Sequence, residues 1–252
     1  MVNMILSNEH IKTYKKKGWV VLKKALDKKE ISKYKDNIFS YLKNNHKKFN
    51  GRNINYFYKK QSFNEISSFH KLQENKKIKK FSEKGIVSKI AQKLLNKKPE
   101  LRASELFIKK KGSGKPTPIH QDAYYWNVKN NQGLTIWVAL TDSNKKNGSV
   151  FYFDSSHKYG VFKHKSSFVK GSSQKIMNEK FLKKFNKSTP NVKKGDIIVH
   201  NSLLVHGSFK NTIKNKRIGW TFCYKPKNLP YDLNRTKKFE KKLYRQIKLR
   251  EA

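Results

Sequence analysis

Apolar and polar positions in the first hundred residues mostly follow the period of α-helices. Residues 28–45 and 83–96 carry apolar side chains at helical spacing, and Ser7 stands where a helix N-cap is expected. A short strand is predicted at 19–24, since these residues are mainly apolar and β-branched. Residues 51–75 contain aromatics without a clear period, so they are expected to form a loop.

Beyond Pro99 the pattern changes to short runs rich in β-branched and aromatic residues, separated by turn signals such as Asn147-Gly148. The predicted strands are 105–110, 134–140, 149–154, 195–202, 203–208 and 217–226. Many short strands after a helical section indicate a mainly β fold with flanking helices, in which two sheets form a jelly roll.

The whole chain, 1–252, is expected to be a single domain. Its mostly helical part, 1–100, would pack on a jelly-roll core at 101–226, and a basic C-terminal segment at 227–252 is predicted to be helical.

Composition qualifies this picture in two ways. Aromatic residues make up 13% of the chain, which favours a packed globule over a disordered polymer. Lys and Arg number 59 against 17 Asp and Glu, giving a formal net charge of +42. Such a charge favours anionic substrates and leaves nucleic acid open as a partner, but arginine, the usual residue for reading phosphates and bases, is scarce.

Compartment and redox chemistry follow from what the sequence lacks. Cys223 is the single cysteine, which excludes an intrachain disulfide and a cysteine-rich zinc site, and its apolar neighbours predict a buried, inert thiol. Neither a signal peptide nor a transmembrane span is evident, so a cytoplasmic protein with no membrane partner is expected.

Three separated side chains suggest a metal site. On a strand, residues two apart point to one face, so His120 and Asp122 are able to hold one cation together, and His206 would complete the set. Two imidazoles and one carboxylate form the facial triad of non-haem iron(II) oxygenases, which leaves metal positions open for cosubstrate and oxygen. Zinc remains a rival for the same ligands.

A basic residue near this site would serve a dicarboxylate cosubstrate. Arg217 lies eleven residues after His206, at the start of the next predicted strand. Its planar guanidinium suits bidentate binding of a carboxylate. Ser208 shares the strand face of His206 and is able to donate its hydroxyl to the same group.

These segments closely resemble the phytanoyl-CoA dioxygenase family of 2-oxoglutarate-dependent oxygenases. The residues that carry the resemblance are 107–126, 135–160 and 193–226, together with the opening stretch 6–31. The resemblance implies a cupin-like double-stranded β-helix, with iron(II) on His120, Asp122 and His206. It implies 2-oxoglutarate and O2 as cosubstrates, with succinate and CO2 released as a small molecule is hydroxylated.

Further roles follow from the same resemblance. Arg217 and Ser208 would bind the distal carboxylate of 2-oxoglutarate, and Trp137 would line that pocket. Tyr124, Tyr125 and Trp126 either border the substrate or serve in packing. Because Asp122 is present, hydroxylation is expected in place of the halogenation seen in relatives that lack this ligand.

Two other functional classes stay open. One is a nucleic-acid-binding protein or nucleic-acid-directed oxygenase, although Cys223 stands where base-repairing demethylases carry a second arginine. The other is a metal-binding jelly roll without oxygenase activity. Among the remaining histidines, His157 is expected in a structural turn or at the pocket mouth, and His200 behind the ligands or in the core. The sequence identifies neither the substrate nor the oligomeric state.

Overall fold

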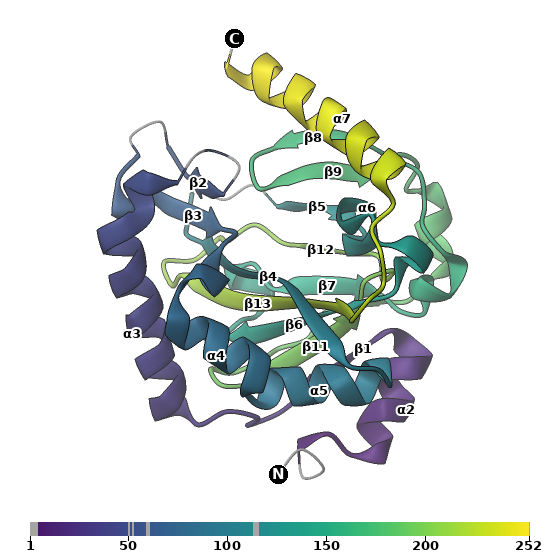
Figure 1. The fold of residues 1–252 in the computed structure, drawn as a ribbon, viewed down its shortest axis with the longest axis horizontal. Helices are drawn as coiled ribbons and strands as arrows, with labels where there is room; N and C mark the ends of the chain where they lie inside the picture. The colour runs from purple at the N-terminus through teal and green to yellow at the C-terminus, as the bar shows by residue number, and fades with distance from the viewer. Residues whose placement is uncertain (1–4, 50, 52, 59–60, 113–115, 252) are drawn as a thin grey trace.

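The computed structural model describes residues 5–49, 51, 53–58, 61–112 and 116–251. Two facing antiparallel sheets form the centre of the molecule, and helices cover the outer face of the larger sheet (Figure 1). This arrangement confirms the predicted fold class, a mainly β jelly roll with flanking helices.

The N-terminal elements form much as their local sequence predicts. Helix α2 (Asn8–Lys17) begins at a capping box made by Ser7 and His10, and it ends at Gly18, whose φ of +86° is left-handed. Strand β1 (Trp19–Leu22) and helix α3 (Lys28–Asn45) follow. The carboxylate of Asp27 accepts two backbone N–H groups at the start of α3.

The expectation of a loop at 51–75 is wrong. Strands β2 (Ile54–Tyr56) and β3 (Ile66–Phe69) pair with each other, and β3 pairs with the long strand β4 (Pro99–Lys109). Each of these two strands is only three or four residues long, too short to show an alternation of apolar and polar residues. They form because β2 pairs with β3 and β3 pairs with β4. The tertiary structure overrides a weak local signal.

The helix expected at 83–96 also needs correction. Two helices meet here, α4 (Lys76–Lys84) and α5 (Ile86–Leu95), and Gly85 between them has an extended backbone. Asn75 caps α4 with its side chain. The apolar period of α5 was visible, but the break at Gly85 and the preceding helix were not.

The large sheet has seven strands in the order β1-β11-β6-β13-β4-β3-β2. Its central members are β6 (Leu134–Ala139), β11 (Ile197–Asn201) and β13 (Arg217–Pro226). The smaller sheet has the order β10-β7-β12-β5. It comprises β5 (Thr117–His120), β7 (Val150–Phe153), β10 (Lys187–Ser188) and β12 (His206–Ser208). A hairpin of β8 (His164–Val169) and β9 (Ser172–Ile176) lies beside β5.

The two faces of the large sheet pack against different parts of the protein. Its outward side chains, such as Ile136 and Trp220, belong to the main apolar core, which they share with α3, α4 and α5. Its inward side chains, such as Trp137, face the smaller sheet and pack with Tyr152 of β7. This alternation along each strand decides which residues lie inside the barrel.

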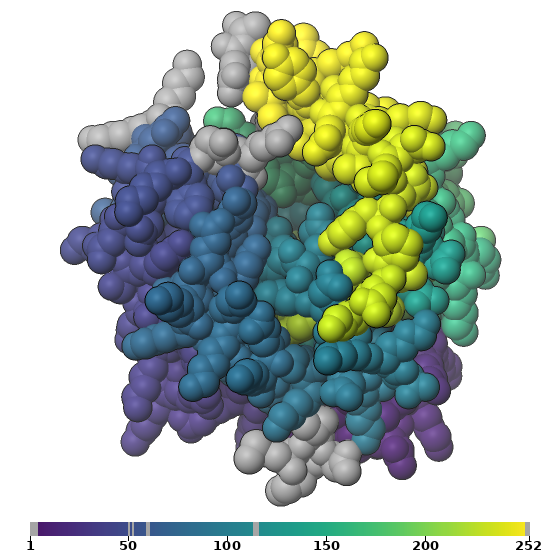
Figure 2. Space-filling model, in the orientation of Figure 1, coloured from purple at the N-terminus to yellow at the C-terminus, as the bar shows by residue number. Residues whose placement is uncertain are grey.

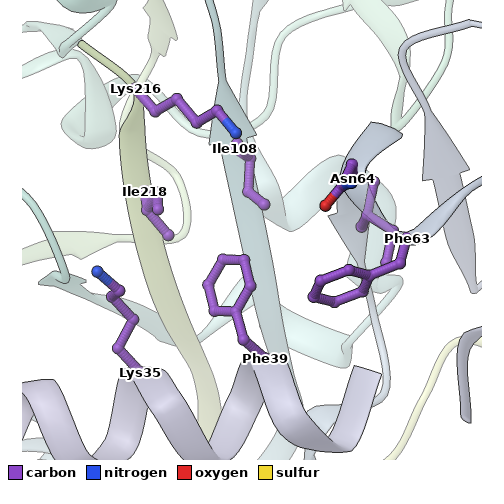
Figure 3. Close-up of a pocket in the computed structure, with 8 residues that line it drawn as sticks. Lys35, Phe39, Phe63, Asn64, Ile108, Lys216 and Ile218 are labelled. Atoms are coloured by element: carbon purple, nitrogen blue, oxygen red, sulfur yellow. The ribbon is translucent and has the colours of Figure 1, made fainter. Parts of the chain in front are cut away.

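A pocket on the outer face illustrates the same alternation. Figure 3 shows it between α3 and the large sheet, with Phe39, Ile108 and Ile218 among its lining residues. Because successive strand residues face opposite ways, Lys109 and Arg217 point to the inner side of the sheet. This pocket is therefore separated from the barrel interior by the sheet itself.

The chain ends in helix α7 (Leu233–Glu251), which lies against β8 and beside the short helix α6 (Asp122–Trp126) (Figure 1). Phe239 of α7 contacts Tyr125 of α6, with ring centroids 5.8 Å apart. Figure 2 shows a recess in the surface between α7 and the blue N-terminal segments.

Short 3-10 helices complete the fold at 46–48, 63–65, 72–74, 129–131, 145–147, 156–159 and 180–184. Among the described residues, no helix is both long enough and apolar enough to cross a membrane.

Candidate metal centre and cosubstrate pocket

His120 and His206 are brought together by pairing between two strands of the smaller sheet. His120 ends β5, His206 begins β12, and the two residues stand opposite each other in the ladder. Their ring centroids lie 4.3 Å apart. The Nδ1–H of each ring donates to a backbone carbonyl two residues earlier, that of Pro118 at 2.7 Å and that of Leu204 at 2.9 Å. Both Nε2 atoms therefore keep a lone pair for a cation.

Asp122 completes the cluster, but by a different backbone route from the one expected. It is the first residue of α6 and does not continue strand β5. The turn into the helix still directs Oδ1 toward the imidazoles, 3.6 Å from Nε2 of His120 and 3.7 Å from Nε2 of His206. The three ligand atoms lie within 4.8 Å of one another.

This donor set fits a first-row divalent cation such as iron(II). It offers two imidazole nitrogens and one carboxylate oxygen, the ligand set of mononuclear iron(II) sites that leave other metal positions to cosubstrates. Burial and the charge of neighbouring His120 lower the pKa of His206 to about 3, so its ring is neutral at physiological pH. Burial opposes ionisation of Asp122. Attraction to His206, which is charged at the low pH where Asp122 takes up its proton, and the contacts of the carboxylate with His120 and His200 hold the pKa of Asp122 well below its usual value.

The second oxygen of Asp122 is held by the large sheet. The hydroxyl of Thr135 donates to Oδ2 at 2.5 Å, and Nε2 of His200 lies 3.1 Å from the same atom. Thr135 and His200 are paired across β6 and β11. Tyr152 lies 3.1 Å from Nδ1 of His200 through its hydroxyl. These contacts orient the carboxylate so that Oδ1 faces the imidazoles.

His200 therefore lies directly behind the candidate ligands, one of the two positions expected for it. Thr135 was missed. It stands two residues before Trp137 on a strand, so strand alternation was the available signal that both side chains face the barrel interior.

Arg217 is buried at the start of β13, with 3% of its surface exposed. Its Nε donates to the carbonyl of Gly148 at 3.1 Å, and the guanidinium lies 5.6 Å from the centroid of the Trp137 ring. Burial lowers its pKa to about 10, so the side chain stays positive at neutral pH. Gly219 makes room for this arrangement, because a Cβ there would lie 2.2 Å from Nε1 of Trp137.

Sequence reasoning does not identify a second basic residue beside Arg217. Lys109 of β4 is paired with Arg217 across the sheet, and its Nζ donates to the carbonyl of Phe209 at 2.7 Å. Burial, followed by the charge of Arg217, lowers the pKa of Lys109 to about 6. The available signal was a lysine on the inward face of an apolar strand.

Ser208 lies on β12, two residues beyond His206, and is buried. Its hydroxyl donates to Oγ1 of Thr117 at 2.6 Å. Within the described part of the chain, no hydrogen bond joins Ser208 to Arg217, so these two side chains are not directly linked.

The aromatic residues of α6 have different surroundings. The Tyr125 ring meets His120 edge-on at 5.5 Å, and its hydroxyl donates to the carbonyl of Gln174 at 3.1 Å. Tyr124 stacks on His164 with ring centroids 4.1 Å apart. Trp126 is buried in a small apolar cluster, which favours a packing role for this residue.

Two residues lie where the sequence placed them. Cys223 is buried, as expected from its apolar neighbours. His157 lies in a turn, with Nε2 3.2 Å from the carbonyl of Lys15, so its contacts fit the structural alternative.

Comparison with known proteins supports the same class of enzyme. A family model described as phytanoyl-CoA dioxygenase matches residues 14–219. Phytanoyl-CoA dioxygenase 1 of Oryza sativa subsp. japonica is 23% identical over 247 residues, which cover 82% of this chain and 84% of that protein. Phytanoyl-CoA dioxygenase domain-containing protein 1 of Danio rerio is 29% identical over 170 residues, which cover 65% of this chain and 57% of that protein.

Solved structures share the fold. The non-haem α-ketoglutarate-dependent carbocyclase SnoK from nogalamycin biosynthesis has a TM-score of 0.71 and 18% identity, covering 92% of this chain and 88% of its own. EctD from S. alaskensis with bound iron has a TM-score of 0.73 and 17% identity, covering 90% of this chain and 79% of its own. The chain belongs to the phytanoyl-CoA dioxygenase family and is a non-haem iron, 2-oxoglutarate-dependent oxygenase.

Proposed function

We propose that this enzyme hydroxylates a C–H bond of a small molecule, with iron(II) held by His120, Asp122 and His206. The observation that supports this assignment is the convergence of three ligand atoms within 4.8 Å, with the remaining atoms of each side chain tied to the surrounding protein. When bound, iron(II) with 2-oxoglutarate activates O2 for the oxidation, and succinate and CO2 are released.

The cosubstrate would lie between the metal ligands and the paired basic residues Arg217 and Lys109. The guanidinium offers a planar donor pair for the distal carboxylate, and burial strengthens that contact by excluding water. The guanidinium lies over the ring of Trp137. Ser208 is proposed to turn its hydroxyl from Thr117 to the same carboxylate when the cosubstrate binds.

The substrate would approach the metal from the side of α6. Tyr125 borders His120 there, and Tyr124 is held in place by its stacking on His164. The structures of SnoN and EctD were solved with nogalamycin RO and 5-hydroxyectoine respectively, and we propose a small molecule here as well. The net charge of +42 favours an anionic one through long-range attraction.

The chain is proposed to act as a single domain. Strands β1, β2 and β3 from the first hundred residues belong to the same sheet as β4, β6, β11 and β13. Separating the N-terminal part would expose two edges of that sheet and the main apolar core.

The metal assignment is tested by measuring iron content after anaerobic loading of the single variants His120→Ala, Asp122→Ala and His206→Ala. Each variant should retain little iron and lose succinate formation, while circular dichroism shows an unchanged fold. His157→Ala, a histidine outside the cluster, should retain iron like the wild type. One iron per chain in all three variants would contradict the assignment.

A further inference from the structure

We infer that Glu105 and His70 form an anchoring site for a hydrogen-bond-donating group of the substrate, a hydroxyl or an amine. This inference rests on the proposed function, since it names the chemistry of a substrate for the same barrel interior. From the sequence, Glu105 reads only as a charge at a strand edge, and His70 has no spacing that gives it a role.

Glu105 faces the inside of the barrel. It lies in β4 on the same side of the strand as Lys109, and its partner on the neighbouring strand β13 is Thr221. Strand β4 is not at an edge, because β13 flanks it on one side and β3 on the other. Helices α4 and α5 pack on the opposite face. The side chain of Glu105 is nevertheless 19% exposed, so solvent reaches it from the barrel side.

A line of contacts connects Glu105 with the metal ligands. Its Oε2 lies 3.8 Å from the Cys223 thiol, which lies 3.9 Å from the hydroxyl of Thr135. Thr135 in turn donates to Asp122. A molecule hydrogen-bonded to Glu105 would therefore lie on the metal side of the sheet, with other atoms of the same molecule able to reach the iron.

The carboxylate is held by a chain of donors that all point toward it. The amide of Asn55 donates to Ser68 Oγ at 3.0 Å, and Ser68 Oγ lies 3.0 Å from His70 Nε2. Nδ1 of His70 lies 2.9 Å from Oε1 of Glu105. This order gives His70 the tautomer with Nδ1–H, so the imidazole donates to Glu105 and fixes its position.

One oxygen of Glu105 remains a strong acceptor. Within the described residues, the hydrogen-bond partner of Oε2 is the Cys223 thiol, and a thiol is a weak donor. The ion-pair partner of Glu105 in the same part of the chain is His70, although lysine is abundant elsewhere. A fixed, partly exposed carboxylate with a weakly satisfied oxygen on the inner face of the sheet fits an O–H or N–H donor of a bound molecule.

The inner face of the large sheet is therefore polarised. Arg217 makes its positive end, and Glu105 makes an acceptor at another position on the same two paired strands. The net positive charge of the surface affects the approach of a molecule, whereas Glu105 selects for a group that donates at close range.

The test uses three probes with the same six-carbon chain: hexylamine, 1-hexanol and hexanoate. Their dissociation constants are measured by ligand-observed NMR on wild-type protein loaded anaerobically with iron(II) and 2-oxoglutarate. Hexylamine, 1-hexanol or both should bind more tightly than hexanoate, and the preferred probe tells whether the donor is charged or neutral. Glu105→Gln should weaken the preferred probe by about tenfold or more, because a charge-assisted hydrogen bond is lost.

Glu100→Gln is the matched control, since Glu100 lies on the same strand and pairs with the buried Lys225. It should leave probe affinity unchanged. Preference for hexanoate, absence of binding by all three probes, or equal affinities in wild type and Glu105→Gln would each overturn the inference. A Glu105→Gln protein with a lower melting temperature but unchanged probe affinity would assign the pair a structural role instead.

The proposed function is judged separately in the same samples. Iron and 2-oxoglutarate binding by the wild type are measured before any probe is added. A wild type that binds neither contradicts the proposed function, whereas one that binds both and does not discriminate among the probes contradicts the anchoring site alone.

Discussion

Nε2 of His200 lies 3.1 Å from Oδ2 of Asp122, while Oδ1 of the same carboxylate faces the imidazoles of His120 and His206. The two oxygens of Asp122 thus have separate tasks. The large sheet holds one of them through His200 and Thr135, and the smaller sheet supplies the imidazoles that face the other. The metal site therefore depends on the docking of the two sheets.

Removing the hydroxyl of Thr135 should weaken the binding of iron(II). Thr135→Val keeps the shape of the side chain but takes one hydrogen bond from Oδ2 of Asp122. Because partners behind the ligands typically contribute tenfold or more to affinity, iron should bind about 10- to 100-fold more weakly. Competition with a chromogenic chelator measures this. Thr221→Val, a buried threonine on neighbouring β13, should bind iron like the wild type, and equal losses in both variants would refute the role of Thr135.

Arg217 should govern binding of the cosubstrate and not of the metal. Arg217→Met removes a buried guanidinium, and loss of a buried charged partner typically costs about 2–5 kcal/mol, roughly 30-fold to several-thousandfold in affinity. Calorimetric titration of the anaerobic iron(II) protein with 2-oxoglutarate should show this loss with iron content unchanged. Arg235→Met serves as the control, since it removes a guanidinium of α7 that donates a hydrogen bond to Asn131. Normal 2-oxoglutarate affinity in Arg217→Met would place the distal carboxylate elsewhere.

Gly219 should be sensitive to the smallest substitution. In Gly219→Ala the new Cβ would approach Nε1 of Trp137 to 2.2 Å, so the indole has to move from its place beside Arg217. Overpacking of this kind costs about 1–3 kcal/mol of unfolding free energy, and 2-oxoglutarate affinity should fall with it. Urea denaturation and calorimetry test both effects. At Gly51 a Cβ would meet nothing within 4 Å, so Gly51→Ala should change neither quantity.

Lys109 should make stability depend on pH. Its pKa is about 6 in the folded protein against 10.5 for the ordinary side chain, so the unfolded chain binds more protons between these values. Wild-type stability relative to Lys109→Met should therefore rise with pH across this window, by about 1.4 kcal/mol per pH unit if Lys109 acts alone. The loss of folding stability caused by burying Lys109 is largest at and below pH 6, and it disappears as the pH approaches 10.

Urea denaturation of both proteins between pH 6 and 9, without cosubstrate, measures this difference. The exposed residue Lys12 provides the control Lys12→Met, whose stability should follow that of the wild type at every pH. A constant difference between wild type and Lys109→Met would show that Lys109 keeps the same protonation state in the folded and unfolded chains.

Much of the fold can be predicted from the local sequence. The capped helices α2 and α3 and the long strand β13 follow from N-caps, apolar period and β-branched content, which act between neighbours in the chain. Strands β2 and β3 do not, because each is only three or four residues long and exists through pairing with the other and with β4.

The chemistry divides in the same way. The sequence by itself determined the types and spacing of the candidate ligands His120, Asp122 and His206 and of the distant Arg217, because these residues lie in short recognisable motifs. Only the tertiary structure decided that Thr135 orients Asp122, that Lys109 lies opposite Arg217, and that His70 positions Glu105 inside the barrel. These contacts join strands far apart in the chain, and only the pairing and docking of the two sheets bring such side chains within hydrogen-bond reach.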